Sequence, residues 1–107
     1  MLRKEMTKQA TDLVIVFQAA IIDIVARMET ARADLGPQDQ EDAQYTLGVL
    51  SMASVNCEAI IIATEAEWCR NETLFRRYIR DAQTLSDSLV ANGYGIVSPT
   101  RAGTATP

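Results

Sequence analysis

Residues 13–28 read LVIVFQAAIIDIVARM. This stretch has no proline or glycine and lies within a longer segment, 7–35, in which helix-forming Ala, Leu, Met, Gln and Arg are frequent. Its isoleucines and valines alone would suit a strand, but the length and the absence of turn signals favour a helix. Its polar residues fall on one narrow line, which includes an ion-pair spacing at Asp23 and Arg27. The predicted helix is therefore apolar around most of its circumference.

A second helix is expected over residues 40–69. Gly36-Pro37 would stop the first helix, and Asp39 can cap the next one. This segment also has a single thin polar line, and small residues form its centre: Gly48, Ser51 and Ser54. Small side chains would let another helix approach closely, which would compensate for the roughly 0.5–1 kcal/mol that a glycine costs inside a helix.

A third helix is expected to begin at Asn71, which is a good N-cap, and to end at Asn92-Gly93. Whether it is continuous with the second helix stays open. It has a narrower apolar stripe: Leu74, Tyr78, Ala82, Leu85 and Leu89. Residues 95–107 are rich in Gly, Thr, Ser and Pro without periodicity. The sequence thus predicts a single helical domain, 1–94, and a flexible C-terminal tail, 95–107.

The predicted fold is all-α: a long antiparallel helical hairpin plus a third C-terminal helix, resembling a three-helix bundle. A helix that is apolar nearly all round must be covered on most sides, and three helices in 107 residues cannot cover two such helices. Soluble monomers seldom tolerate the apolar patch that would remain. We therefore expect a homodimer whose first and second helices form a four-helix core. The alternative is a monomer covered by its own third helix and tail.

The residues expected at this interface are large and apolar. They are Leu13, Val14, Phe17, Ile21, Ile22, Val25, Leu50, Ile60, Ile61 and Trp68. A tryptophan at this position is usually a core residue between helices, and the alternative is an interface anchor, a role in which tryptophan is enriched.

The net charge of −4 argues against general nucleic-acid binding, which needs clustered lysine and arginine. The chain has one basic cluster: Arg70, Arg76, Arg77 and Arg80. This cluster either contacts an acidic or phosphate-bearing partner or forms a solvated face balanced by nearby acids. A nucleic-acid-associated protein that uses this arginine face is the alternative function.

Catalysis is not expected. The chain has no histidine, so the commonest general base and zinc ligand are absent. Cys57 and Cys69 would lie about 18 Å apart on one continuous helix, too far for a disulfide, and two reduced thiols are expected. Asp12, Asp23, Glu58 and Glu65 are interpreted as solvated helix charges rather than metal ligands. We predict no cofactor and no metal.

The location expected for this chain is the cytoplasm. The apolar run 13–22 is too short and too closely flanked by charge to span a bilayer. Basic residues before that run and Ala31-Arg32-Ala33 after it outline a secretory signal, so secretion after cleavage is the minority alternative. The sequence thus predicts a non-enzymatic, self-associating interaction module that acts as an adaptor, an assembly chaperone or a small inhibitor of a larger protein.

Overall fold

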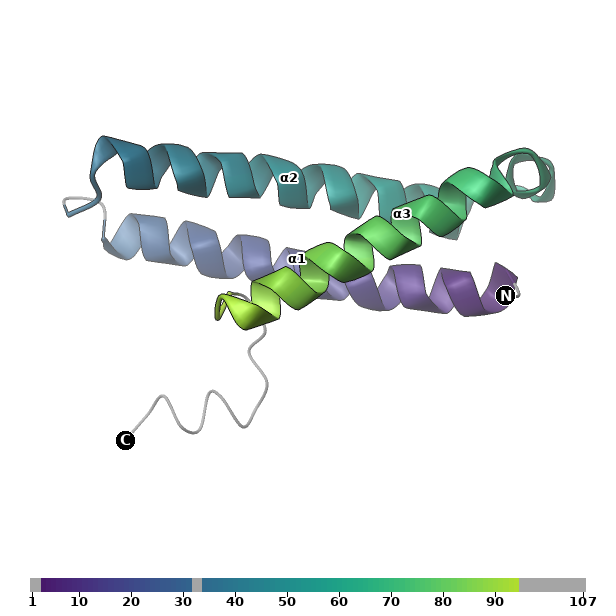
Figure 1. The fold of residues 1–107 in the computed structure, drawn as a ribbon, viewed down its shortest axis with the longest axis horizontal. Coiled ribbons are helices and arrows are strands. Elements are labelled where there is room, and N and C mark those ends of the chain that lie inside the picture. Colours follow the sequence, from purple (N-terminus) through teal and green to yellow (C-terminus); the bar gives the residue numbers. More distant parts are fainter. Residues whose placement is uncertain (1–2, 32–33, 95–107) are drawn as a thin grey trace, which may run out of the picture.

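The computed structural model describes residues 3–31 and 34–94, and these form three α-helices with no strand among them. The helices are α1 (Arg3–Thr30), α2 (Pro37–Ile62) and α3 (Glu65–Ala91). α1 and α2 lie side by side over most of their length, and α3 crosses in front of α1 at an oblique angle (Figure 1). The all-α, bundle-like prediction is therefore confirmed. The predicted tail, 95–107, lies outside the described residues.

Each helix buries a line of residues at alternating spacings of four and three, the pattern of helices that pack at a shallow angle. On α1 this line is Met6, Ala10, Leu13, Phe17, Ala20 and Ile24. On α2 it includes Leu50, Ser54 and Cys57, and on α3 it is Phe75, Ile79, Ala82, Ser86 and Leu89. Together these lines form the one core of the described chain.

The segment between α1 and α2 differs from the prediction. α1 begins at Arg3 and ends at Thr30, so it is shifted toward the N-terminus relative to the expected 7–35. Gly36 does not close α1; with extended backbone angles it is the N-cap of α2, and Pro37 takes the first helical position. Proline is favoured there because its missing N–H would have no partner in any case. Asp39 lies in the first turn rather than at the cap.

The boundary between α2 and α3 was predicted wrongly. α2 ends at Ile62, and Thr64 caps α3. The Thr64 hydroxyl accepts a hydrogen bond from the Glu67 backbone N–H at 3.2 Å, and the Glu67 carboxylate accepts one from the Thr64 N–H at 2.8 Å. This reciprocal capping box begins α3 six residues before Asn71, which lies inside the helix. The hydrogen bonds from Thr64 also lower the pKa of Glu67 below its ordinary value.

Replacing Thr64 with alanine is expected to lower the free energy of unfolding by about 1 kcal/mol, the usual effect of losing an N-cap. Urea denaturation followed by circular dichroism would measure this loss. Thr84 is the matched control, because its hydroxyl bonds only to the Arg80 carbonyl within the middle of α3. Equal losses for Thr64→Ala and Thr84→Ala would contradict a capping role.

Two arginines of α1 hold the two ends of α3 against α1. Arg3 pairs with Glu65, donates to the Ala63 carbonyl and lies 5.8 Å from the centre of the Trp68 ring. At the other end, Arg27 donates to the Gly93 carbonyl at 3.1 Å and lies over the Tyr94 ring. The predicted Arg27–Asp23 ion pair is present at 2.9 Å. These contacts fix the oblique path of α3 across α1.

Candidate interaction surfaces

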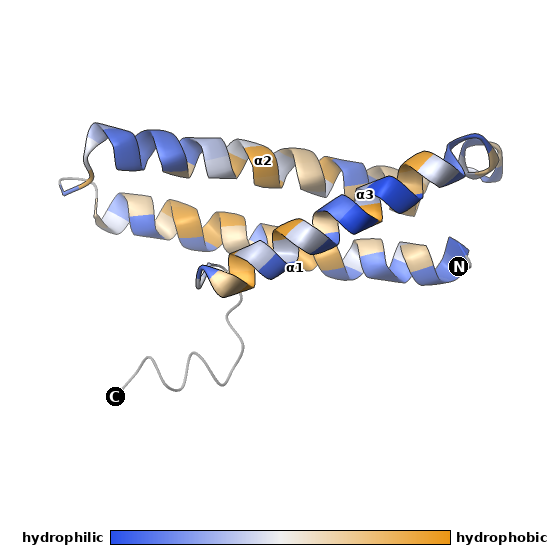
Figure 2. Ribbon diagram, in the orientation of Figure 1, coloured by the Kyte–Doolittle hydropathy of each residue, from blue (hydrophilic) through white to orange (hydrophobic). Residues whose placement is uncertain are grey.

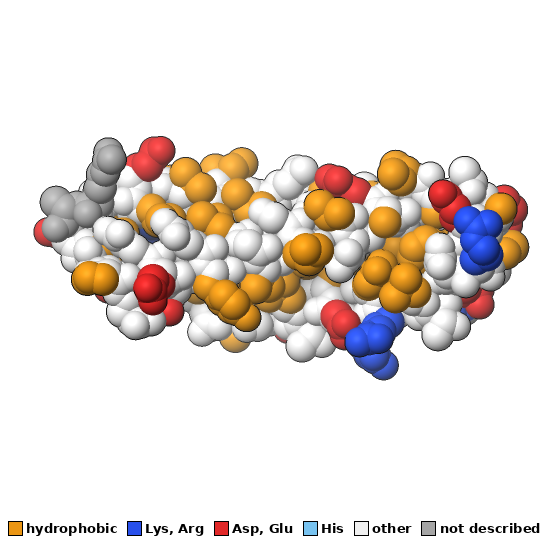
Figure 3. Space-filling model, turned by 90° about the horizontal axis from the view of Figure 1, so that it is seen from above, with side chains coloured by type: hydrophobic (Ala, Val, Ile, Leu, Met, Phe, Trp, Pro, Cys, Tyr) orange, Lys and Arg blue, Asp and Glu red, His pale blue; other side chains and the backbone are white. Residues whose placement is uncertain are grey.

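The outer side of α2 is apolar and exposed. Exposed side chains lie opposite its buried line, and we call them the α2 strip: Tyr45, Met52, Val55 and Ile62. Met52 is 63% exposed and Ile62 is 79% exposed. Viewed from above, hydrophobic side chains lie along most of this face with few charged ones between them (Figure 3). Such a line of large apolar groups is typical of a contact surface rather than of a solvated helix face.

α1 has a similar line, the α1 strip, which consists of Ile15, Ile22 and Val25. Ile15 and Ile22 lie about half a turn away from the buried Leu13–Ile24 line, so this strip points away from α2. Colouring by hydropathy shows many hydrophobic residues along α1 and the second half of α2, whereas in α3 they alternate with hydrophilic residues (Figure 2). The α1–α2 pair therefore carries apolar surface on both outer edges.

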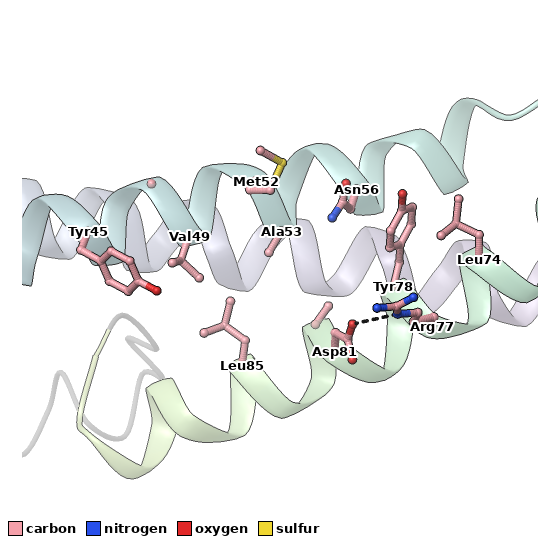
Figure 4. A pocket seen from close by; sticks show the side chains of 12 residues that line it. Tyr45, Val49, Met52, Ala53, Asn56, Leu74, Arg77, Tyr78, Asp81 and Leu85 are labelled. Carbon is pink, nitrogen blue, oxygen red and sulfur yellow. Dashed lines mark ion pairs between the residues drawn. The ribbon is translucent and has the colours of Figure 1, made fainter.

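A groove of about 790 Å³ lies between α2 and α3, next to the α2 strip. Tyr78 and Leu85 rise from α3 toward α2, and Val49 and Ala53 project from α2 toward α3 (Figure 4). The groove exists because α3 leaves α2 to cross α1, which separates the two helices as they run on from the junction. Its lining is mainly apolar, as in grooves that receive an amphipathic helix.

Polar groups mark the edge of this groove on α3. Arg77 pairs with Asp81 at 4.0 Å, and both side chains are largely exposed. Asn56 of α2 lies across from them (Figure 4). An exposed pair at this distance contributes little to stability, so Arg77 can exchange Asp81 for another acid without a large cost.

The ten residues predicted for the interface divide into three groups by burial. Half of them are buried inside the protomer: Leu13, Phe17, Leu50, Ile60 and Trp68. Val14, Ile21 and Ile61 are partly buried against the core, and Ile22 and Val25 are exposed in the α1 strip. The exposed Tyr45, Met52, Val55 and Ile62 were not predicted, although their spacing on a largely apolar helix was a visible signal.

The buried face of α3 also differs slightly from the predicted apolar stripe. Ala82 and Leu89 are buried as expected, but Phe75, Ile79 and Ser86 complete the buried line. Leu74, Tyr78 and Leu85 instead line the groove. The apolar arc of α3 thus serves both the core and the groove.

The arginine cluster lies on α3 and is exposed. Arg76 pairs with Glu72 at 3.4 Å, and Arg80 approaches Asp81 at 3.8 Å. With the Arg77–Asp81 pair, three of the four arginines contact acids on the same helix. This balance supports the interpretation of a solvated face.

The two cysteines are separate thiols, with Cys57 buried and Cys69 exposed. Burial, together with a smaller contribution from the negative charge of Glu58, raises the pKa of the Cys57 thiol to about 11. Because the thiolate is the reactive form, Cys57 is inert near neutral pH. Within residues 3–31 and 34–94 no group of three or more His, Cys, Asp or Glu side chains is arranged to hold a metal ion.

Gly48 lies in the middle of α2 on its outer side. A Cβ atom added there would meet nothing within 4 Å. Close packing of another helix of the described protomer therefore does not account for this glycine. Of Gly48, Ser51 and Ser54, Ser54 alone is buried. The described chain contains no contact that compensates for a glycine in the middle of a helix.

By length and composition alone, α1 and α2 are both long and apolar enough to cross a membrane. Core helices of soluble proteins and N-terminal signal sequences meet the same test. Charged and amide side chains interrupt both segments, including Asp23 and Gln18 in α1 and the exposed Glu58 in α2. Such groups are expensive in lipid, whereas the rim of a protein interface accommodates them.

Comparison with known proteins gives no family for this chain. No protein-family model, no curated protein and no solved structure matches it significantly. What the chain does must therefore be inferred from its own exposed residues.

Proposed function

We propose that this chain is a non-enzymatic helical interaction module that self-associates, with α1 and α2 as a long antiparallel hairpin that pairs in a dimeric helical bundle. The observation that carries this proposal is the α2 strip, because its four large apolar side chains are exposed along one face of one helix. A second copy that covered this strip would remove them from water, and each buried side chain of this size contributes about 1.5–3 kcal/mol.

The α1 strip lies on the opposite edge of the protomer and would stay available in such a dimer. A second apolar surface that remains exposed suits an adaptor, an assembly chaperone or a small inhibitor of a larger protein, since each must hold a partner as well as itself. The absence of histidine and the buried, high-pKa thiol of Cys57 support a role without catalysis.

Light scattering coupled to gel filtration tests the proposal. The wild-type chain is expected to have the mass of a dimer at high micromolar concentration. Met52→Glu is expected to raise the dimer Kd by at least about 100-fold, because a symmetric interface would contain the unpaired buried charge twice. Val90→Glu is the matched control: Val90 is exposed but lies on α3 outside both strips.

Three outcomes would contradict self-association through the α2 strip. A wild-type chain that stays monomeric at the highest soluble concentration has no interface with itself. A wild-type chain that sediments with phospholipid vesicles and loses this property on Met52→Glu uses the α2 strip for a membrane instead. Equal effects of Met52→Glu and Val90→Glu on the mass would remove the α2 strip from the interface.

A further inference from the structure

The charged residues of α2 and α3 are distributed differently along the two helices. α2 has Asp39, Glu41 and Asp42 in its first turns and no lysine or arginine anywhere along its length. α3 carries all its arginines between Arg70 and Arg80, so its last turns have none. The start of α2 and the start of α3 lie at opposite ends of the molecule (Figure 1). The acids of α2 are therefore distant from these arginines within one copy.

A second α2 beside the groove could run in either of two directions. If it ran parallel to the first, the two acidic starts would lie side by side and repel each other. If it ran antiparallel, the acidic start of each copy would lie toward the end of the groove where α3 of the other copy carries Arg77. Complementary charge therefore selects the antiparallel arrangement.

The groove has the size and chemistry to receive this helix. Its floor and walls are apolar, and the residues of the α2 strip that border it, Tyr45 and Met52, are exposed. α2 has 26 residues, a length of about 39 Å, so it spans the whole α2 side of the groove, which runs from Tyr45 to Asn56. A two-fold axis near the middle of α2 lets each copy offer the same surface to the other.

Gly48 gives independent support for contact at this place. It lines the groove, its Cβ position is open, and a glycine there destabilises the isolated helix. A glycine on the exposed side of α2 would let the backbone of a second α2 come close. Close approach of a second α2 would thus explain a glycine at this position, whereas no contact within the described protomer explains it.

From these observations we propose that the groove between α2 and α3 receives α2 of a second copy, antiparallel to the first, with Glu41 of each copy beside Arg77 of the other. This inference rests on the proposed self-association and specifies its geometry. Arg77 exchanges its exposed partner Asp81 for Glu41 of the second copy on assembly. The dimer is isologous, and α3 lies at the border of the interface.

A charge-exchange experiment tests this arrangement by sedimentation equilibrium. Glu41→Arg and Arg77→Glu are each expected to raise the dimer Kd about tenfold, because each change places two like-charged pairs in a symmetric interface. The chain with both changes is expected to recover a Kd within about threefold of wild type, since the pair is restored with its signs reversed. Glu29→Arg and Lys8→Glu, both exposed on α1, are the matched controls and should leave Kd unchanged.

Gly48→Leu gives a second readout that does not depend on charge. Nothing in the protomer obstructs the added side chain, so the thermal stability of the monomer should not fall. The dimer Kd should rise at least about tenfold, because the leucine would separate the two α2 helices.

The outcomes separate the two proposals. A monomeric wild-type chain overturns self-association and this geometry together. A wild-type dimer whose Kd responds to Met52→Glu but not to the single charge changes or to Gly48→Leu keeps self-association and overturns the groove arrangement. Single charge changes that weaken the dimer without recovery in the doubly changed chain overturn the pairing of Glu41 with Arg77.

Discussion

Phe17→Ala is expected to lower the free energy of unfolding by about 3–5 kcal/mol, the usual cost of a large cavity in a core. The Phe17 side chain has no exposed surface and lies in the middle of the buried line of α1, between Leu13 and Ala20. A domain of this size is stabilised by only about 5–15 kcal/mol in total, so the variant should lose a large part of its stability. Urea denaturation followed by circular dichroism measures the loss.

Ile22→Ala is the matched control for this prediction. Ile22 belongs to the same helix and is also a large apolar residue, but it is 69% exposed. Its replacement should change the stability of the protomer by less than about 0.5 kcal/mol. Both variants should be measured in the Met52→Glu background, because self-association adds to the apparent stability in proportion to concentration. Equal losses at the two positions would contradict the assignment of the Phe17 face of α1 to the core.

The comparison of Phe17 with Ile22 also shows what the sequence could not decide. The helical character of 13–28 was clear, because periodicity, length and composition agree there. The side of that helix that packs against the core was not clear, because apolar residues occupy nearly every direction around it. The choice depends on how the three helices fit together, and the sequence pattern of a single segment does not contain this information.

The end of α2 was predictable in principle and was missed. The residues from Thr64 to Glu67 have the spacing of a capping box, which marks a helix start even when no glycine or proline precedes it. The prediction instead took Asn71, another good capping residue, as the start of the third helix. The groove could not be predicted from the sequence, because it forms where α3 separates from α2. The contacts of Arg3 and Arg27 that direct α3 join residues about 60 positions apart, and no local pattern indicates them.

Trp68→Ala is expected to cost about 3–5 kcal/mol of folding stability and to have little direct effect on the dimer Kd. The sequence left open whether Trp68 is a core residue or an interface anchor. In the structure its ring is 6% exposed, and its centre lies 5.3 Å from that of Phe75. Arg3 approaches the same ring while it holds Glu65, so Trp68 joins the start of α3 to the start of α1. Losing the ring removes core packing and the support for this arginine.

Tyr45→Ala should show the opposite pattern, because Tyr45 is an aromatic residue that is 76% exposed on the α2 strip. Its loss should leave the unfolding of the protomer nearly unchanged and raise the dimer Kd, since exposed aromatic side chains are frequent anchors of interfaces. Urea denaturation at low protein concentration and sedimentation equilibrium at high concentration give the two readouts for both variants. If Trp68→Ala weakened the dimer while the protomer kept its stability, Trp68 would be an anchor between copies. The α3 junction would then have to open in the assembly, because a side chain enclosed by its own protomer cannot contact another.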